Sequence, residues 1–268
     1  MFCVFKFKKI CGTFFLLLGV IFIVSSLFGI NKGDIAVIAS GFEPTYSIVI
    51  DAGHGEPDGG AVSKSGVKEA GLNLEIALKL KEELDALGYN VIMTRDTENN
   101  IADEDKQSSI RKMKVSDINN RINIVNGSEA DMLISIHMNN FENSKYYGWQ
   151  SFYKKGCEYS KLIAENIQMG ISNNIERENN RVALQISNIK LIDNSNIPAV
   201  IVECGFLSNP EDLRLLLTEE YKIQIVNGII DGIEMYYKKN VWIFPYIQII
   251  GKEDERIGLY IWKVMRRR

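Results

Sequence analysis

Residues 48–60 of this 268-residue chain read IVIDAGHGEPDGG. The apolar residues at the start predict a short buried strand, and the glycines that follow predict a turn that presents His54. The second of the two histidines in the chain, His137, follows another apolar strand at residues 132–136, in the run MLISIHMNN. Two strands that each deliver an imidazole at the carboxyl end predict a metal site at one edge of a sheet.

Strands and helices are expected to alternate along the chain. The expected strands are residues 48–50, 89–94, 132–136, 149–153, 189–192 and 199–204. Five helices are expected. The first runs from Glu69 to Leu87 and is closed by Gly88, and the second runs from a Ser116 cap to Gly127. The others cover residues 159–171, begin at Asn209-Pro210, and cover residues 219–237. The polar residues 96–115 and 173–188 are expected to be loops. This pattern predicts an α/β fold, with a central, mostly parallel or mixed sheet of about six strands flanked by helices.

The N-terminus predicts a transmembrane helix. Residues 1–9 are basic, with three lysines, and residues 10–30 are uncharged and apolar. About 20 such residues span a bilayer, whereas a signal-peptide core has roughly 7–15. Because lysines precede the run, we expect a cytosolic N-terminus and an exported body. We therefore expect an uncleaved signal anchor, with cleavage after Ala39 as the alternative that would give a secreted protein.

Four segments are expected from these features. Residues 1–30 form the anchor, 31–46 a linker, 47–238 the catalytic domain and 239–268 a C-terminal tail of unknown role. The tail contains two apolar runs, VWIFPYIQII and IGLYIW, separated by GKEDER. It is interpreted either as a β-hairpin on the domain or as a segment that contacts a partner or a membrane.

Charge and cysteine content exclude some classes of function. The formal charge of −3 is unevenly distributed, with +3 on residues 1–39, +4 on residues 239–268 and −10 on the residues between them. An acidic body argues against nucleic acid as a substrate, because binding phosphates needs a basic face. The four cysteines show no CxxC spacing and predict no disulfide framework.

The simplest candidate for the third ligand of the expected metal site is Glu69. Zinc in hydrolases usually takes three protein ligands and leaves one position for water, and two histidines with one glutamate is a known set. Glu69 lies fifteen residues after His54 at the start of the next helix, from which its carboxylate can reach back over the strand ends. The alternatives are a helix-dipole carboxylate for Glu69 and hydrogen-bonded structural roles for the histidines.

Glu203 is the candidate proton carrier. It ends the apolar run AVIVE, and a buried carboxylate needs either a partner or a chemical role. Beside a zinc-activated water it would take a proton and give it to the leaving nitrogen. The alternative is a structural ion pair, for example with Arg95. Cys204 should point to the opposite face and lie in the core.

Together, IVIDAGHGEPDGGAV, Glu69, SIHMNN and VECGFLSNP resemble the zinc-dependent N-acetylmuramoyl-L-alanine amidases of the amidase_3 type. The resemblance runs from about residue 48 to residue 237. It implies one Zn²⁺ on His54, Glu69 and His137, with Glu203 as the catalytic carboxylate. It also implies supporting or substrate-side roles for Arg95, Arg121, Asn126, Asn139 and Asn209. The departures from the family pattern at Ala52, Glu56 and Cys204 remove no ligand.

Within that family, the N-terminal apolar segment, GWQSFYK and RKMKVSDINNRINIVN are most similar to the spore-cortex, germination-specific amidases. This implies hydrolysis of the amide between the lactyl group of N-acetylmuramic acid and L-alanine of peptidoglycan, on the route to muramic δ-lactam. The catalytic domain would then act outside the cytoplasm, with the forespore intermembrane space as one expected location. Because no wall-binding repeat is visible, a localising or activating partner protein is a further hypothesis.

Two other functions stay open on sequence alone. One is a cysteine-type cell-wall peptidase that uses Cys204 with His137. Sensitivity to a chelator would favour zinc, and inactivation by a thiol reagent would favour cysteine. The other is a non-catalytic, membrane-anchored wall-binding protein, against which the complete set of His54, Glu69, His137 and Glu203 argues.

Overall fold

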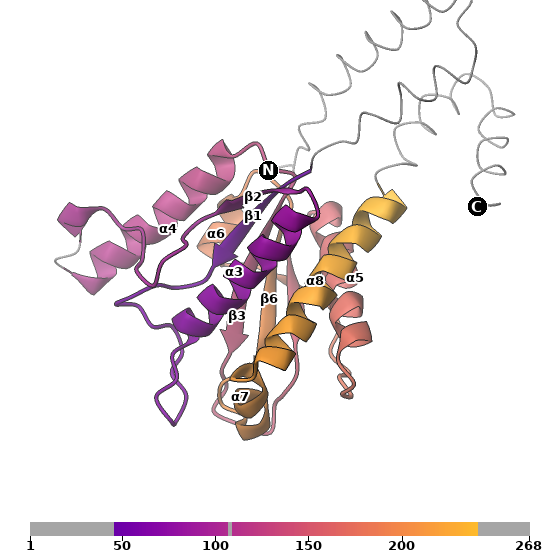
Figure 1. Cartoon of the computed structure of the whole chain (residues 1–268). Helices are drawn as coiled ribbons and strands as arrows, with labels where there is room; N and C mark the ends of the chain where they lie inside the picture. Colours follow the sequence, from indigo (N-terminus) through magenta and orange to yellow (C-terminus); the bar gives the residue numbers. More distant parts are fainter. Residues whose placement is uncertain (1–45, 107–108, 241–268) are drawn as a thin grey trace, which may run out of the picture.

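The computed structural model describes residues 46–106 and 109–240 (Figure 1). Its middle layer is a six-stranded sheet in the order β2-β1-β3-β6-β4-β5. Four neighbouring strands run parallel, namely β2 (Asn90–Met93), β1 (Ser47–Ala52), β3 (Met132–Asn139) and β6 (Ala199–Phe206). β4 (Gln150–Lys154) is antiparallel to β6, and β5 (Leu184–Ile186) is parallel to β4. The expected α/β fold with a mixed sheet of about six strands is confirmed.

Helices cover both faces of the sheet. α3 (Glu69–Ala86), α5 (Glu158–Asn174) and α8 (Glu219–Asn240) pack on one face, and α4 (Ile110–Gly127) and α6 (Lys190–Asn194) pack on the other. A short 3₁₀ helix, η1 (Glu104–Lys106), precedes α4, and α7 (Pro210–Leu216) follows β6. In Figure 1 the arrowheads of β3 and β6 point toward α7, whereas α8 ends on the opposite side.

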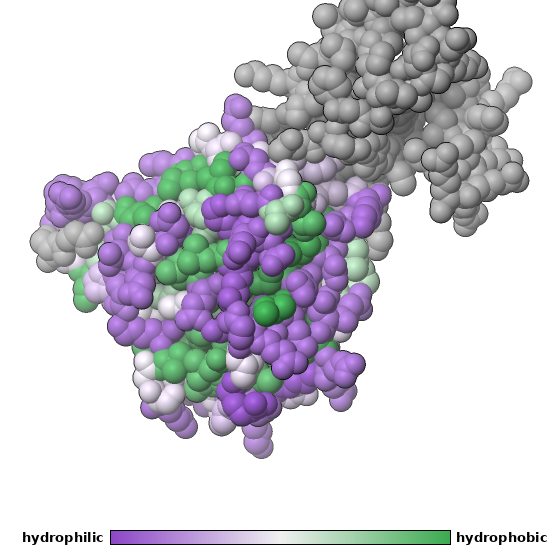
Figure 2. Space-filling model, in the orientation of Figure 1, coloured by the Kyte–Doolittle hydropathy of each residue, from purple (hydrophilic) through white to green (hydrophobic). Residues whose placement is uncertain are grey.

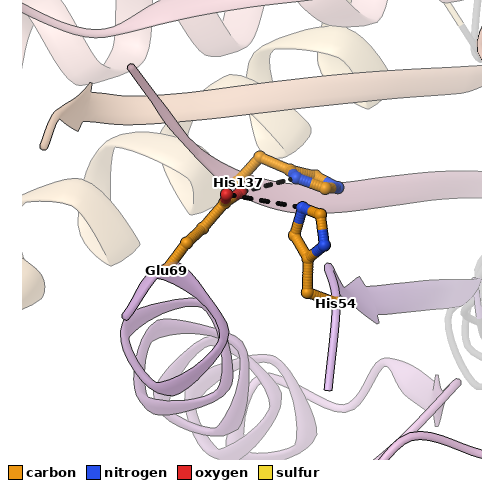
Figure 3. A group of neighbouring side chains, drawn as sticks. All are labelled: His54, Glu69 and His137. Atoms are coloured by element: carbon orange, nitrogen blue, oxygen red, sulfur yellow. Dashed lines mark hydrogen bonds and ion pairs between the residues drawn. The ribbon is translucent and has the colours of Figure 1, made fainter. Parts of the chain in front are cut away.

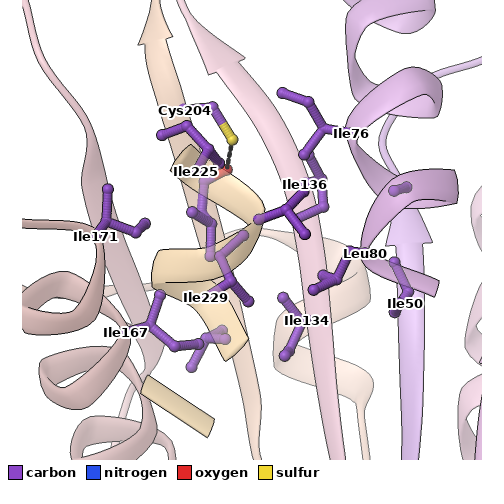
Figure 4. Close-up of a cluster of buried hydrophobic side chains, with 14 of the residues drawn as sticks. Ile50, Ile76, Leu80, Ile134, Ile136, Ile167, Ile171, Cys204, Ile225 and Ile229 are labelled. Atoms are coloured by element: carbon purple, nitrogen blue, oxygen red, sulfur yellow. Dashed lines mark hydrogen bonds between the residues drawn. The ribbon is translucent and has the colours of Figure 1, made fainter. Parts of the chain in front are cut away.

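The larger core lies between the sheet and the helices α3, α5 and α8. Alternate strand residues such as Ile50, Ile134 and Ile136 point into it, together with Cys204 (Figure 4). The residues between them, such as Leu133, face α4 and α6 in a smaller cluster. This division follows from the two-residue period of a strand. The predicted core position of Cys204 is confirmed, since its exposed fraction is 0%.

Glycines allow α5 and α8 to pack closely. A Cβ atom added to Gly228 would lie 2.4 Å from the Cα of Ile171, and one added to Gly170 would lie 2.2 Å from the Gly228 carbonyl oxygen. Gly232 is equally close to Ile167. Because these neighbours are backbone atoms, a side chain at any of the three glycines would push the two helices apart.

We predict that Gly228→Ala lowers the free energy of unfolding by about 1–3 kcal/mol, the usual cost of overpacking. Gly71→Ala is the matched control, because Gly71 also lies in a helix but has no atom within 4 Å of its added Cβ. That substitution should raise stability by roughly 0.5–1 kcal/mol through helix propensity. Urea unfolding measures both values, and equal effects of the two substitutions would contradict the packing argument.

Two expectations about residues 96–127 were wrong. Residues 110–115 belong to α4 rather than to a loop, and Ser116 lies inside that helix rather than at its cap. The Ser116 hydroxyl donates a hydrogen bond to Asp103 Oδ2 at 2.7 Å instead. The first turns of α4 are polar and exposed, with Met113 as their one buried hydrophobic residue, so they carry no amphipathic pattern. Gly88 does follow α3, with φ at +86°.

The expected strand at residues 189–192 was also wrong. That segment enters α6, where Leu191 and Ile192 are buried beside α4. The sixth strand is β5, inside the segment that was expected to be a loop. A segment of four residues, three of them apolar, fits one turn of helix as well as it fits a strand, so periodicity could not distinguish these structures.

The predicted anchor at 1–30 and nearly all of the linker and tail lie outside the described residues. Among the helices within residues 46–240 that the structure describes, none combines the length and the apolarity needed to cross a bilayer. Figure 2 shows the face that carries α3 and α8, on which hydrophilic residues predominate and hydrophobic residues form smaller patches.

Candidate metal centre

Three side chains that are far apart in the sequence meet at the carboxyl ends of the parallel strands. His54 follows β1, His137 lies on β3, and Glu69 begins α3 (Figure 3). His137 Nδ1 is 2.9 Å from Glu69 Oε1, and His54 Nε2 is 3.4 Å from Glu69 Oε2. One donor atom from each residue lies within 4.8 Å of the other two. Two imidazoles and a carboxylate at this spacing could hold a metal ion.

Glu69 is held by groups other than the histidines. Its Oε2 accepts a hydrogen bond from the Ala61 amide at 2.8 Å, and its Oε1 accepts one from the Met138 amide at 3.2 Å. Asn73, one helical turn further along α3, donates to the same Oε1 at 3.3 Å. Burial opposes ionisation, but His137, His54 and the Ala61 amide lower the pKa of Glu69 to about 2. The carboxylate is therefore ionised and oriented at neutral pH.

His54 adopts an unusual backbone conformation, with φ at +61°. This left-handed region is disfavoured for residues other than glycine and persists only where surrounding contacts enforce it. The His54 carbonyl accepts a hydrogen bond from Arg121 Nη2. Its ring Nδ1 lies 3.1 Å from Asp58 Oδ2, which leaves Nε2 to face Glu69. A carboxylate on the remote ring nitrogen is the common way of orienting a metal-ligating histidine.

Arg95 and Arg121 hold the turn that carries His54. Arg95 donates to the carbonyl oxygens of Ala52 at 2.8 Å and Gly53 at 2.9 Å. Arg121 donates to the same Ala52 oxygen at 2.7 Å and to Asp51 Oδ1 at 2.7 Å. Both arginines are buried, with exposed fractions of 3% and 2%. The alternative interpretation of Glu203, an ion pair with Arg95, is not found, because the Arg95 guanidinium donates to backbone carbonyls instead.

Gly53 makes room for the second imidazole. A Cβ atom at this position would lie 2.3 Å from His137 Cε1 and 2.4 Å from Nε2. The His137 ring therefore lies directly against the backbone that follows β1. Any side chain at residue 53 would displace it.

Asp51 is a buried acid that the sequence reasoning did not identify. It accepts hydrogen bonds from Arg121, from Thr94 Oγ1 at 2.7 Å and from Ser135 Oγ at 2.6 Å. Burial alone would raise the pKa of Asp51, but Arg121 and the two hydroxyl groups lower it from 3.8 to about 2. Asp51 on β1 thus contacts Ser135 on β3 and Thr94, the residue after β2, just before the candidate metal centre.

We predict that Asp51 makes the fold acid-sensitive. Because its folded-state pKa lies below its ordinary value, its contribution is full above about pH 4 and is lost as the pH falls toward 2. A shift of this size corresponds to about 2 kcal/mol. The free energy of unfolding of Asp51→Asn should therefore fall less than that of the parent between pH 4.5 and 2, as measured by urea titration. Parallel pH profiles would contradict this role.

Glu203 lies beside His137, since the two residues are direct partners in the β3–β6 register. Its Oε2 has no hydrogen-bond partner among the described residues. Burial raises the pKa of Glu203 to about 7, and the charge of Glu69 acts in the same direction against the opposing effect of His137. A carboxyl group with such a pKa can both accept and release a proton near neutral pH.

The three predicted asparagines make hydrogen bonds with the backbone of the scaffold. Asn126 joins α4 to the segment after α6 through the Asn194 carbonyl and the Asn196 amide. Asn139 accepts a hydrogen bond from the Asn140 amide at the end of β3. Asn209 caps α7, which confirms the predicted helix start.

Sequence reasoning missed the groups that orient the ligands. Asp58 is four residues after His54 and is also paired with Lys114 at 2.9 Å. Asn73 is four residues after Glu69 on one helix face. This spacing was the available signal for Asn73, because residues i and i+4 of a helix are neighbours.

The cysteine alternative is weakened, since Cys204 is fully buried and burial raises the pKa of its thiol well above 9.

Comparison with known proteins identifies the class of protein. The family model for N-acetylmuramoyl-L-alanine amidases of the Amidase_3 type matches residues 48–235. The chain therefore belongs to this family of hydrolases, and the predicted enzyme class is confirmed.

Individual relatives agree with this assignment. The germination-specific N-acetylmuramoyl-L-alanine amidase of Bacillus subtilis is 36% identical over 190 residues, which cover 71% of this chain and 79% of that protein. The structure of the CwlD amidase from Clostridioides difficile in complex with the GerS lipoprotein superimposes with a TM-score of 0.71 at 38% identity. It covers 72% of this chain and 99% of that one. The catalytic domain of CwlV from Bacillus (Paenibacillus) polymyxa gives a TM-score of 0.62 at 26% identity, covering 72% and 99% of the two chains.

Proposed function

We propose that the chain is a zinc hydrolase whose single Zn²⁺ is held by His54, Glu69 and His137. The observation that carries this proposal is the convergence of two imidazole nitrogens and one carboxylate oxygen within 4.8 Å. These donor types are a known set for catalytic zinc. The low pKa of Glu69 supports it further, because a ligand must be deprotonated to bind a metal.

The reaction is hydrolysis of a linear amide, and Glu203 carries the proton. A zinc ion bound to the three ligands would polarise the scissile carbonyl and lower the pKa of the attacking water. Glu203 takes one proton from that water as its oxygen bonds to the carbonyl carbon. It then gives the proton to the amide nitrogen as the carbon–nitrogen bond breaks, so that a carboxylic acid and an amine result. Its burial and its pKa of about 7 support this role.

The substrate proposed is the amide between the lactyl group of N-acetylmuramic acid and L-alanine of peptidoglycan. The similarity to the germination-specific amidase of Bacillus subtilis supports spore cortex as the peptidoglycan and muramic δ-lactam as the later product. The enzyme would then act outside the cytoplasm, either anchored by residues 1–30 or secreted. The complex of the Clostridioides difficile relative with a lipoprotein supports a protein partner for this chain too.

We predict that Glu203→Gln lowers kcat by about 100–10,000-fold, because the proton carrier is lost. Its zinc content should stay at one per chain, since Glu203 is not a proposed ligand. His137→Ala should lose both zinc and activity. Metal analysis beside amidase assays measures these effects, with Cys204→Ser as a control that keeps activity. Full activity of Glu203→Gln would remove the proposed mechanism and revive a non-catalytic function.

We predict that digestion of isolated sacculi by the purified chain releases peptides with a free L-alanine amine and leaves muramoyl residues without peptide. Mass spectrometry of the products identifies the bond that is cut. Addition of a chelator should stop the reaction and Zn²⁺ should restore it. Products cut within the stem peptide would contradict the proposed substrate bond. Full activity of the chain alone would show that no activating partner is required.

A further inference from the structure

A group of aromatic and arginine side chains lies beyond the carboxyl ends of β3 and β6. Three of its members are on the connection from β3 to β4, two follow α5, and one ends β6. We call this group the aromatic rim. Its members are Phe141, Tyr146, Tyr147, Arg177, Arg181 and Phe206.

The rings of Phe141, Tyr146 and Phe206 form one connected cluster, and the Tyr147 ring lies under the Arg177 guanidinium. The Phe141 ring is 5.4 Å from that of Tyr146 and 5.5 Å from that of Phe206, centroid to centroid. Phe206 is fully buried and forms the base of the cluster. Phe141, Tyr146 and Tyr147 keep exposed fractions of 48%, 47% and 39%. Three large aromatic residues with such exposure on one short connection are unusual for a surface that contacts only water.

The two arginines lie over these rings. The Arg181 guanidinium is 4.5 Å from the centroid of Phe206, and the Arg177 guanidinium is 4.6 Å from that of Tyr147. Asp212 neutralises Arg177, with 2.5 Å between Oδ1 and Nη1. Arg181 donates to the Tyr147 carbonyl and to Gln150 Oε1, both neutral. Its Nη2 has no hydrogen-bond acceptor among residues 46–106 and 109–240, so a donor is left for a ligand.

The connection that carries the rim is fixed in place. The Phe141 amide donates to Ser208 Oγ at 3.1 Å, and Asn209 Nδ2 donates to the Ser144 carbonyl at 2.8 Å. The Gly148 amide donates to Asp212 Oδ2 at 2.8 Å. Exposed rings on a fixed backbone lose little conformational entropy when a ligand binds, which favours a binding surface.

The rim lies in line with the metal centre. Phe206 is three residues beyond Glu203 on β6, which is about 10 Å at about 3.3 Å per residue. Gln150, which accepts a hydrogen bond from Arg181, is the direct partner of Glu203 in the β4–β6 register. A polymeric substrate whose amide lies beside Glu203 therefore passes over the rim if it continues in this direction.

We propose that the aromatic rim binds the glycan strand of peptidoglycan, next to the muramoyl residue whose amide is cut. This inference rests on the proposed function and assigns a subsite to it. Exposed ring faces suit the C–H faces of sugar rings, and a free guanidinium nitrogen suits hydroxyl or acetamido oxygens. The carboxylates of the stem peptide suit the rim less well, because Asp212 already neutralises Arg177 and most of the exposed surface of the rim is uncharged.

The test uses the double variant Phe141→Ala/Tyr146→Ala and two substrates. On intact peptidoglycan strands its kcat/KM should fall about tenfold or more, mainly through KM. On a single N-acetylmuramoyl-peptide, which has no neighbouring sugar, it should stay within twofold of the parent. Phe141→Tyr/Tyr146→Phe keeps both rings and should keep both activities. Tyr159→Ala is the matched control, because Tyr159 lies at the start of α5 and has a similar exposed fraction of 45%.

Binding is measured separately with glycan strands stripped of peptide. The Glu203→Gln protein should bind them, and adding the two rim substitutions should weaken binding about tenfold. Equal losses on both substrates, unchanged binding of stripped glycan, or weakened binding of free stem peptide instead would each overturn the proposal. An inactive parent that still binds glycan through the rim would refute the proposed hydrolysis while leaving the subsite intact.

Discussion

The whole site depends on how the chain ends its first strand. Beyond Ala52 the carbonyl groups of residues 52–54 leave the strand ladder inside the protein, where unpaired carbonyls are costly. Two buried guanidinium groups, from Arg95 and Arg121, supply the missing donors. Asp51, itself buried, neutralises one of them. This cluster allows the positive φ of His54, and that conformation turns the imidazole toward Glu69. The unusual backbone conformation of His54, a proposed ligand, is therefore stabilised by the buried charged side chains of Arg95, Arg121 and Asp51.

In the same part of the molecule, Glu69 and Glu203 have different environments and therefore different pKa values. Glu69 receives two backbone amides, Asn73 and an imidazole, and its pKa is low. Glu203 receives no hydrogen bond at Oε2 from the described residues, and burial raises its pKa to about 7. Two acids with diverging pKa values beside each other are typical of sites in which one group fixes charge and the other moves protons. The division follows from the supply of donors: the Ala61 amide and the Met138 amide, which lies at the register shift of β3, both reach Glu69, whereas no donor among the described residues reaches Glu203 Oε2.

The sequence predicted what depends on local pattern and composition. Strand-end histidines, the start of α3 at Glu69 and the mixed α/β order were all readable from apolar runs and turn residues. The first half of α4 and the helix α6 were not, since neither shows a clear period. Asp51 was missed because its role depends on residues that are distant in sequence, such as Thr94 and Ser135. Asp58 lies only four residues from His54, but its second partner, Lys114, is also distant in sequence. The family pattern implied supporting or substrate-side roles for Asn126 and Asn209, and the hydrogen bonds of both residues lie within the scaffold.

The antiparallel direction of β4 explains why the sheet edge that holds Glu203 and the proposed ligands also carries the exposed aromatic residues. β3 and β6 run parallel, so the chain between them must return across the molecule, whereas β4 runs opposite to both. The connection from β3 to β4 therefore stays at the carboxyl edge, where the proposed ligands and Glu203 lie. The α7 segment holds that connection through Ser208, Asn209 and Asp212. A parallel β4 would have required a crossover away from this edge. The antiparallel strand thus gives the candidate metal centre a fixed neighbouring surface on one side, and a long substrate needs contacts beyond the bond that is cut.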